Sequence, residues 1–227
     1  MVTISHVVKK LVRQRPLLYE AIAQDIVSFA ALADHLKHDI ETELGSEAKH
    51  PAIIMALRRF SEQVKPLEQK KIPFRFNSEI IMKTGLADIT CVRTLAILNK
   101  LKHIYDLVDY EKGETLNVIH GNYELTIVIS ERHTKRLLKL LEGEKVLNIE
   151  HNLVSLTMSF SKDFLYTPGI LAKVTRKLHW EAVNVFENIS TMTELIYIVE
   201  KKDAVRAYTA LTDLIEEVDT EQEEDGS

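Results

Sequence analysis

The second part of this chain repeats itself. Aligning Met82 with Met158 places "SEIIMK" over "LVSLTMSF", two stretches with the texture of strands, at an offset of 76 residues. Further on, "IVISERHTKRLLKLL" aligns with "YIVEKKDAVRAYTAL" at an offset of about 70, with Arg136 over Arg206. Self-similarity at a fixed period indicates a structural unit that occurs more than once. The chain is therefore expected to contain one small fold twice.

Each copy reads as strand, helix, strand, strand, helix. "TCVRTLAILNKL" and "PGILAKVTRKL" have helical spacing of apolar residues, whereas "YELTIVIS" and "ELIYIVE" alternate as strands do. This order matches a ferredoxin-like unit, an antiparallel sheet with both helices on one face. We therefore predict an α+β fold with two ferredoxin-like βαββαβ modules side by side, over residues 74–150 and 151–218. A closing strand, "KVLNI", is visible only in the first copy, so "IPFRF" at 72–76 or a partner chain would supply the last strand of the second.

The remaining segments differ in texture. Residues 1–65 predict an all-helical domain, in which Ser28 is an N-cap and Gly45 a C-cap of one helix. Two prolines and three lysines in "KPLEQKKIPF" indicate a linker over 66–73. The acidic segment 219–227 predicts a disordered tail, since it is too polar to bury.

Pro168 and Gly169 stand where a strand passes into a helix. Proline is tolerated in the first turn of a helix, because the N–H that it lacks would have no intrahelical partner there. Glycine leaves the backbone bare, which permits the close approach of a ligand. The pair therefore marks a place where backbone N–H groups could meet an anionic group at the positive end of a helix.

Residues 168–211, from "PGILAKV" to "RAYTAL", resemble an ACT domain, and most closely the paired ACT domains that regulate aspartokinases. The resemblance implies that the modules pair and hold a small effector, usually an amino acid, between them. It places that effector against the loop 162–169 and polar groups of the next strand. The implied effector-binding residues are Asp163, Thr167, Pro168, Gly169, Ile170, Asn184, Glu187 and Asn188.

Two departures from the family pattern limit this expectation. Many ACT loops carry an acidic residue two positions before the Pro-Gly pair, where this chain has Tyr166. The corresponding loop of the first copy, "KTGLADITC", has no Pro-Gly pair. If one module has lost its ligand, we expect it to be the first.

The helical domain allows two interpretations. "SFAALADHL" and "HPAIIMALRRF" could form a helix-turn-helix that presents Lys49, Arg58 and Arg59 to DNA. A dimerisation or docking unit is the alternative. It is favoured by the long acidic spacer between the two helices and by the small net charge of residues 1–73, 11 Lys and Arg against nine Asp and Glu.

Other chemistries lack support. Phosphate loops, nucleophile elbows and zinc-protease motifs are missing, and seven glycines leave little material for phosphate-binding loops. A metal cluster at Asp34, His35, His38, Asp39 and His50 would lack a fixed second shell, so a solvated helix face is the preferred interpretation. The one cysteine, Cys91, excludes an intrachain disulfide, and a small buried thiol is favoured over a reactive one.

We accordingly expect a non-enzymatic, ligand-responsive regulatory protein without cofactor or metal. Its expected partners are an amino-acid effector, a second copy in a homodimer, and either a biosynthetic enzyme or DNA. The alternative is a transcriptional regulator that uses the helix-turn-helix for output and the ACT pair as sensor. Without an apolar stretch of about 20 residues or a signal peptide, a cytoplasmic protein without membrane attachment is expected.

Overall fold

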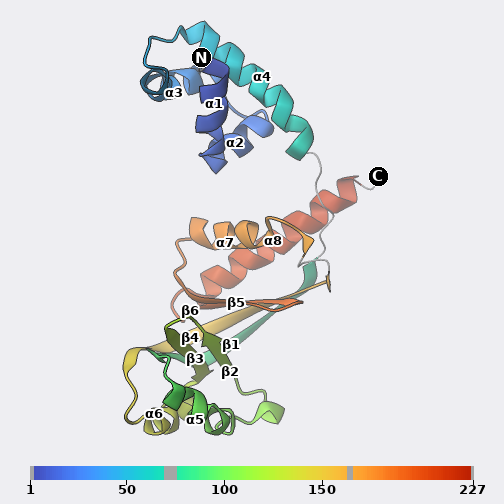
Figure 1. Cartoon of the computed structure of the whole chain (residues 1–227). Helices are drawn as coiled ribbons and strands as arrows, with labels where there is room; N and C mark the ends of the chain where they lie inside the picture. Colours follow the sequence, from blue (N-terminus) through green and yellow to red (C-terminus); the bar gives the residue numbers. More distant parts are fainter. Residues whose placement is uncertain (1–2, 69–75, 163–165, 226–227) are drawn as a thin grey trace. The chain divides into compact units, whose positions relative to one another are not determined.

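The computed structural model describes residues 3–68, 76–162 and 166–225. The chain divides into two compact units, Met1–Ile72 and Pro73–Ser227 (Figure 1). Residues 69–73 of the expected linker lie outside the described residues.

Every described element of the first unit is an α-helix. The helices are α1 (Ile4–Arg13), α2 (Pro16–Ala23), α3 (Phe29–Leu44) and α4 (His50–Glu68). The Ser28 hydroxyl accepts the backbone N–H of Ala31 and so caps α3. Gly45 ends the same helix with φ 65°, in the left-handed region that glycine enters at little cost. Both caps agree with the sequence, whereas α4 runs three residues past the expected boundary at 65.

One apolar cluster holds these helices together. Its members on α3 and α4 recur at three- and four-residue spacing, which turns one face of each helix inward. They are Leu32, Ala33, Leu36, Ile40, Ile53, Leu57, Phe60 and Val64. Two residues of α1, Val7 and Val8, are fully buried in the same cluster.

The second unit is built on a six-stranded sheet with the order β2-β3-β1-β4-β6-β5. All neighbouring strands are antiparallel. In chain order the elements are β1 (Phe76–Val92), α5 (Leu95–Tyr105), the 3-10 turn η1 (Tyr110–Lys112), β2 (Leu116–His120), β3 (Glu124–Ser130), the 3-10 turn η2 (Glu131–His133), α6 (Thr134–Leu140), β4 (Val146–Phe160), α7 (Ile170–Trp180), β5 (Val185–Ser190), β6 (Glu194–Glu200) and α8 (Ala204–Asp225).

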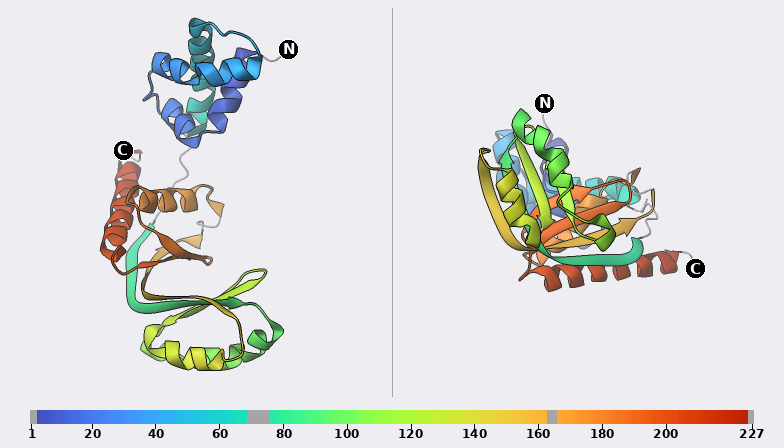
Figure 2. Two further views of the ribbon diagram at one scale, coloured as in Figure 1. Left: turned by 90° about the vertical axis from the view of Figure 1, so that its left-hand side faces the viewer. Right: turned by 90° about the horizontal axis from the view of Figure 1, so that it is seen from below.

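Two long strands, β1 and β4, run through both halves of this sheet (Figure 2). Residues 86–92 of β1 lie between β3 and β4, whereas residues 76–83 pair with β4 alone. We call β2, β3, α5 and α6, with residues 86–92 and the start of β4, the first half. The second half comprises β5, β6, α7 and α8, with residues 153–160 and the start of β1. Each half thus has four strands. One outer strand of the first half is the start of β4, and one outer strand of the second half is the start of β1.

This arrangement corrects the sequence analysis in two respects. The closing strand of the second half comes from the same chain, from β1, and not from a partner; of the proposed segment 72–76, only Phe76 is described, and it pairs with Phe160. The segment "SEIIMK" therefore belongs to the second half, and the expected division at 150/151 falls inside β4.

The segment "KTGLADITC" is also not a loop. Residues 86–92 form a strand in which Ala87, Ile89 and Cys91 are buried. The connection to α5 is short, and the Thr94 hydroxyl caps the helix by accepting the N–H of Ile97 at 3.1 Å. Residues 86–92 of the first half are therefore equivalent to residues 154–160 of the second, at an offset of 68. The alignment of Met82 with Met158 is wrong, because it matches two strands that occupy different positions in the fold.

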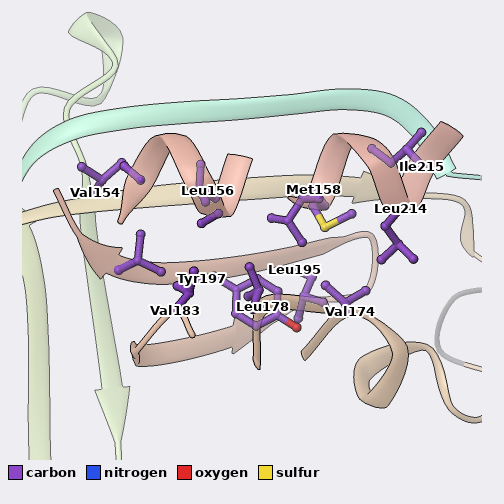
Figure 3. Close-up of a cluster of buried hydrophobic side chains, with 14 of the residues drawn as sticks. Val154, Leu156, Met158, Val174, Leu178, Val183, Leu195, Tyr197, Leu214 and Ile215 are labelled. Carbon is purple, nitrogen blue, oxygen red and sulfur yellow. The ribbon is translucent and has the colours of Figure 1, made fainter. Parts of the chain in front are cut away.

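The two helix pairs lie on the outer sides of the two halves, α5 and α6 on the first and α7 and α8 on the second (Figure 1). In the first half, Ile97 and Ile104 of α5 and Leu137 of α6 pack on β1 and β3. In the second half, α7 and α8 pack on β4 and β6 around the fully buried Tyr197 and Leu156 (Figure 3). The mixed α/β fold with an antiparallel sheet is as predicted.

The helix-free faces of the two halves pack against each other. Leu86, Val128, Leu153 and Ile198 come from both halves and form one buried cluster. The bends that permit this contact lie where the long strands pass between halves, because Gly85 and Asn152 have φ 70° and 56° and the ladder of β1 with β4 shifts register there. Such bulges bend a strand and increase its twist.

The acidic end of the chain differs from expectation. Residues 219–225, expected to be disordered, continue α8 to Asp225. Glutamate and glutamine have good helix propensity, which explains how a helix can extend through a segment too polar to bury.

Candidate effector-binding site

The start of α7 carries backbone N–H groups that have no intrahelical acceptor. Gly169 is the N-cap with φ 90°, and no side chain caps the helix. The first intrahelical hydrogen bond runs from Lys173 N–H to the Gly169 carbonyl at 2.9 Å, so the N–H groups of residues 170–172 have no intrahelical acceptor. A Cβ at Gly169 would meet no atom of the described residues within 4 Å. The positive end of the helix is therefore accessible to an anionic group.

The residues around this helix start have different roles. Pro168 and Tyr166 are exposed and Thr167 is half-buried. Ile170 is 8% exposed and packs in the core of the second half, so its side chain holds the helix and is not available to a ligand. Asp163 lies outside the described residues.

The predicted residues near β5 are not brought together. Asn184, just before the strand, is exposed. Glu187 pairs with Ile198, whose side chain lies in the helix-free interface, whereas Asn188 pairs with Tyr197, whose side chain lies under the helices. Glu187 and Asn188 thus lie on opposite faces, and only Asn188 is on the face that carries α7.

Glu187 instead belongs to a carboxyl cluster between the halves. Burial, and then the nearby Asp88 carboxylate, raise the pKa of Glu187, although a hydrogen bond from Thr126 opposes the shift. The contact joins β5 to β1 and β3, consistent with the packing of the two helix-free faces.

Asp88 is the most deeply buried member of the cluster. It is 4% exposed, and its carboxyl accepts a hydrogen bond from the Thr90 hydroxyl at 3.3 Å. Burial is the main cause that raises its pKa, and the charge of Glu150 adds to it. Asp88 is not among the residues predicted from the sequence, because "KTGLADITC" resembles a loop and not a strand. No metal-binding group of three His, Cys, Asp or Glu occurs among the described residues.

Cys91 is fully buried in β1. Burial, followed by the charges of Glu144 and Asp88, raises the pKa of its thiol to about 11. A thiol with this pKa is almost entirely protonated near neutrality and so a weak nucleophile. The interpretation of Cys91 as a small buried residue is confirmed.

In the first unit, Lys49, Arg58 and Arg59 are exposed, and none has an ion-pair partner within the described residues. The two acidic residues of the disfavoured metal cluster each pair with one basic side chain. Asp34 lies 2.9 Å from His50, and Asp39 pairs with Arg15, whose hydrogen bond lowers the pKa of that carboxyl.

None of the helices in the described ranges is long and apolar enough to cross a membrane.

No protein family model and no curated protein sequence matches this chain. Among solved structures, the aspartate kinase of Clostridium acetobutylicum aligns with a TM-score of 0.52 and 17% identity, over 64% of this chain and 36% of its own length. The Synechocystis aspartate kinase aligns with a TM-score of 0.51 and 12% identity, over 71% of this chain and 32% of its own. The regulatory subunit of aspartate kinase from Thermus thermophilus aligns with a TM-score of 0.48 and 13% identity, over 63% of this chain and 98% of that subunit.

This chain thus spans about a third of the length of the two kinases that it resembles. At these identities the likeness concerns the fold. It shows that this chain shares a fold with part of these two kinases.

Proposed function

We propose that this chain is a ligand-responsive regulatory protein whose second unit is a pair of ACT-like modules that binds an amino acid. The effector carboxylate would lie against the N-terminus of α7. The observation that supports this most directly is the open space beside Gly169, where backbone N–H groups of the first turn lack intrahelical partners. The fold shared with aspartate kinases adds to the proposal.

The helix terminus supplies only part of the binding energy. A carboxylate at such a terminus gains about 0.3–1 kcal/mol from the helix dipole, more where it is partly buried. Selective binding therefore requires side chains, and Thr167 and Asn188 are the predicted residues that remain near the helix-bearing face. A second copy could complete the site, since β5 is an edge strand of the sheet and is open to pairing.

The role proposed here is regulatory and requires no catalysis. The effector would shift the chain between two arrangements by binding one more tightly, and a coupling free energy of about 1–3 kcal/mol is sufficient. The change would act on a biosynthetic enzyme that docks on the helical unit.

A thermal-shift screen against the twenty amino acids tests the effector. A specific ligand at 100 times its Kd stabilises the folded state by about 2.7 kcal/mol. Gly169→Ala should weaken binding about tenfold or more, because the Cβ enters the space the ligand would occupy. Gly143→Ala is the matched control, since Gly143 also has positive φ (86°), also has open space around its Cβ and lies in the first half. No stabilisation by any amino acid, or equal binding by both variants, would refute the proposal.

DNA binding is the second candidate, because Lys49, Arg58 and Arg59 are exposed cations without ion-pair partners in the described part of the chain. If the three contact phosphates, the logarithm of the binding constant should fall with a slope of about −3 per subunit against the logarithm of salt concentration. Mobility-shift assays of Arg58→Ala/Arg59→Ala should show weaker binding, and Arg136→Ala/Lys139→Ala in the second unit is the control. Capture of one enzyme that persists after nuclease treatment would favour docking instead.

A further inference from the structure

A cavity of about 510 Å³ lies where β1 passes from the second half into the first, and no residue of α7 lines it. Its walls are residues 83–86 of β1, residues 112–115 after η1, and residues 130–132 at the end of β3. The volume is within the range of small-molecule sites. Except for Leu86, the lining residues are polar, charged or glycine.

The charged side chains of the cavity favour an anion. Its cations are Lys83, Lys112 and Arg132, and its acids are Glu114 and Glu131. Each acid already has at least one partner within the described residues. Three cations thus line the cavity against two acids, and each acid already uses at least one carboxylate oxygen in a contact with the protein.

Glu114 is almost fully engaged. Its carboxylate accepts the backbone N–H of Asp109 at 3.0 Å, pairs with Arg132 and lies 2.6 Å from Nε2 of His133. The Asp109 N–H is the main cause that lowers the pKa of Glu114, so this group stays charged and fixed in the wall. Glu131 lies 3.0 Å from Nδ1 of His151.

Lys83 differs from the other cations of the cavity. Its ammonium donates to the carbonyl of Gly113 at 3.2 Å, and no carboxylate pairs with it in the described ranges. Lys112 pairs with Asp109 at 2.8 Å. An ammonium has three donors, so two of those of Lys83 remain for a ligand.

The backbone at the same wall is also released from the sheet. Thr84 and Gly85 have no partner in the described ladders of β1 with β3 and with β4, because the register shifts between Lys83 and Leu86. Gly85 adopts φ 70° there. Bulges of this kind occur often beside functional sites.

We propose that this cavity is a binding site for a small anion, a phosphate or a carboxylate, held by the Lys83 ammonium beside the bulge at Thr84 and Gly85. The site is separate from the helix start at Gly169 and does not depend on the proposed amino-acid effector. The bulge lies where β1 passes from the second half of the sheet into the first. An anion bound here would therefore contact the segment of β1 that connects the two halves.

NMR titration of the full chain with inorganic phosphate and, separately, with succinate tests the site. The chain has only seven glycines, so their backbone amide signals can be followed individually. We expect saturable shifts of the Gly85 and Gly113 signals, with Gly143 unchanged. A shift of Gly169 alone would instead report the proposed effector site, so the two proposals succeed or fail separately.

Lys83→Gln removes the charge while keeping a polar side chain, and it should weaken anion binding about tenfold, as for loss of a charge-assisted hydrogen bond. Lys102→Gln, an exposed lysine of α5 outside the cavity, is the matched control. Saturation by phosphate only or by succinate only supports the site and identifies its ligand. No shift at Gly85 and Gly113 with either probe, or equal affinity of the two variants, overturns it.

Discussion

Replacing Asp88 by asparagine should stabilise the second unit at neutral pH. The carboxylate is 4% exposed, accepts a hydrogen bond from Thr90, and shares its surroundings with Glu150 and Glu187. Asparagine keeps an acceptor for Thr90 and offers an N–H₂ group to the neighbouring carboxylates. Leaving a buried polar group poorly satisfied costs about 1–3 kcal/mol, so we expect the free energy of unfolding to rise by about 1–2 kcal/mol.

The gain should depend on pH in a defined direction. The pKa of Asp88 is raised in the folded state, so the folded protein retains a proton that the unfolded chain releases. The wild-type contribution of this group is therefore fully present below its ordinary pKa and is lost as pH rises through the raised value. The advantage of Asp88→Asn should accordingly be small near pH 4 and reach its full size above the raised pKa.

Urea unfolding at several pH values measures this difference. Trp180, the one tryptophan, lies in α7 and reports the second unit. Asp109, Glu114 and Glu144 have lowered pKa values and give the opposite pH trend, but the difference between variant and wild type removes their common contribution. Asp213→Asn, on the exposed side of α8, is the control. A variant less stable than wild type at neutral pH, or a difference constant with pH, would refute the reasoning.

Three further substitutions test other parts of the second unit by the same urea assay. Leu156→Ala removes a fully buried side chain and should lower the free energy of unfolding by about 2–5 kcal/mol, while exposed Leu171→Ala should change little. Glu114→Gln should destabilise at neutral pH and lose this effect as pH falls, because the charged form of Glu114 is stabilised in the folded state. Gly85→Ala should cost about 1–2 kcal/mol from its left-handed backbone alone, since a Cβ there meets no atom within 4 Å; equal stability would place the strain elsewhere.

Local signals in the sequence predicted the features that depend on local chemistry. The hydroxyl of Ser28 and the missing Cβ of Gly45 fix the ends of α3 without help from distant residues. The same holds for Gly169, whose positive φ at the start of α7 is a property of the glycine and its neighbours. The helical unit, the repeated pattern and the start of the candidate site could therefore be predicted.

Features that depend on non-local pairing could not be predicted. Lys83, Thr84 and Gly85 resemble a turn in sequence, yet they form a bulge inside one continuous strand whose two ends pair in different halves. Asp88 occupies a polar position of an alternating strand, and its burial against Glu187 becomes evident only when the two helix-free faces meet. The register shift between Val185 and Glu187 likewise decides which face Glu187 occupies, and nothing in the local sequence indicates it.

Shared strands make the two halves depend on each other. The start of β4 closes the first half, with Ile149 packed on its core, and the start of β1 closes the second, with Ile80 and Met82 packed on that core. Either half alone would therefore lose both an outer strand and the apolar side chains that the strand contributes. Since α7 packs on residues 153–160 of the same β4, a displacement at that end of the strand is transmitted along one continuous backbone to the first half. A sheet assembled in this way can respond to a ligand as one body, although its sequence consists of two copies of a smaller fold.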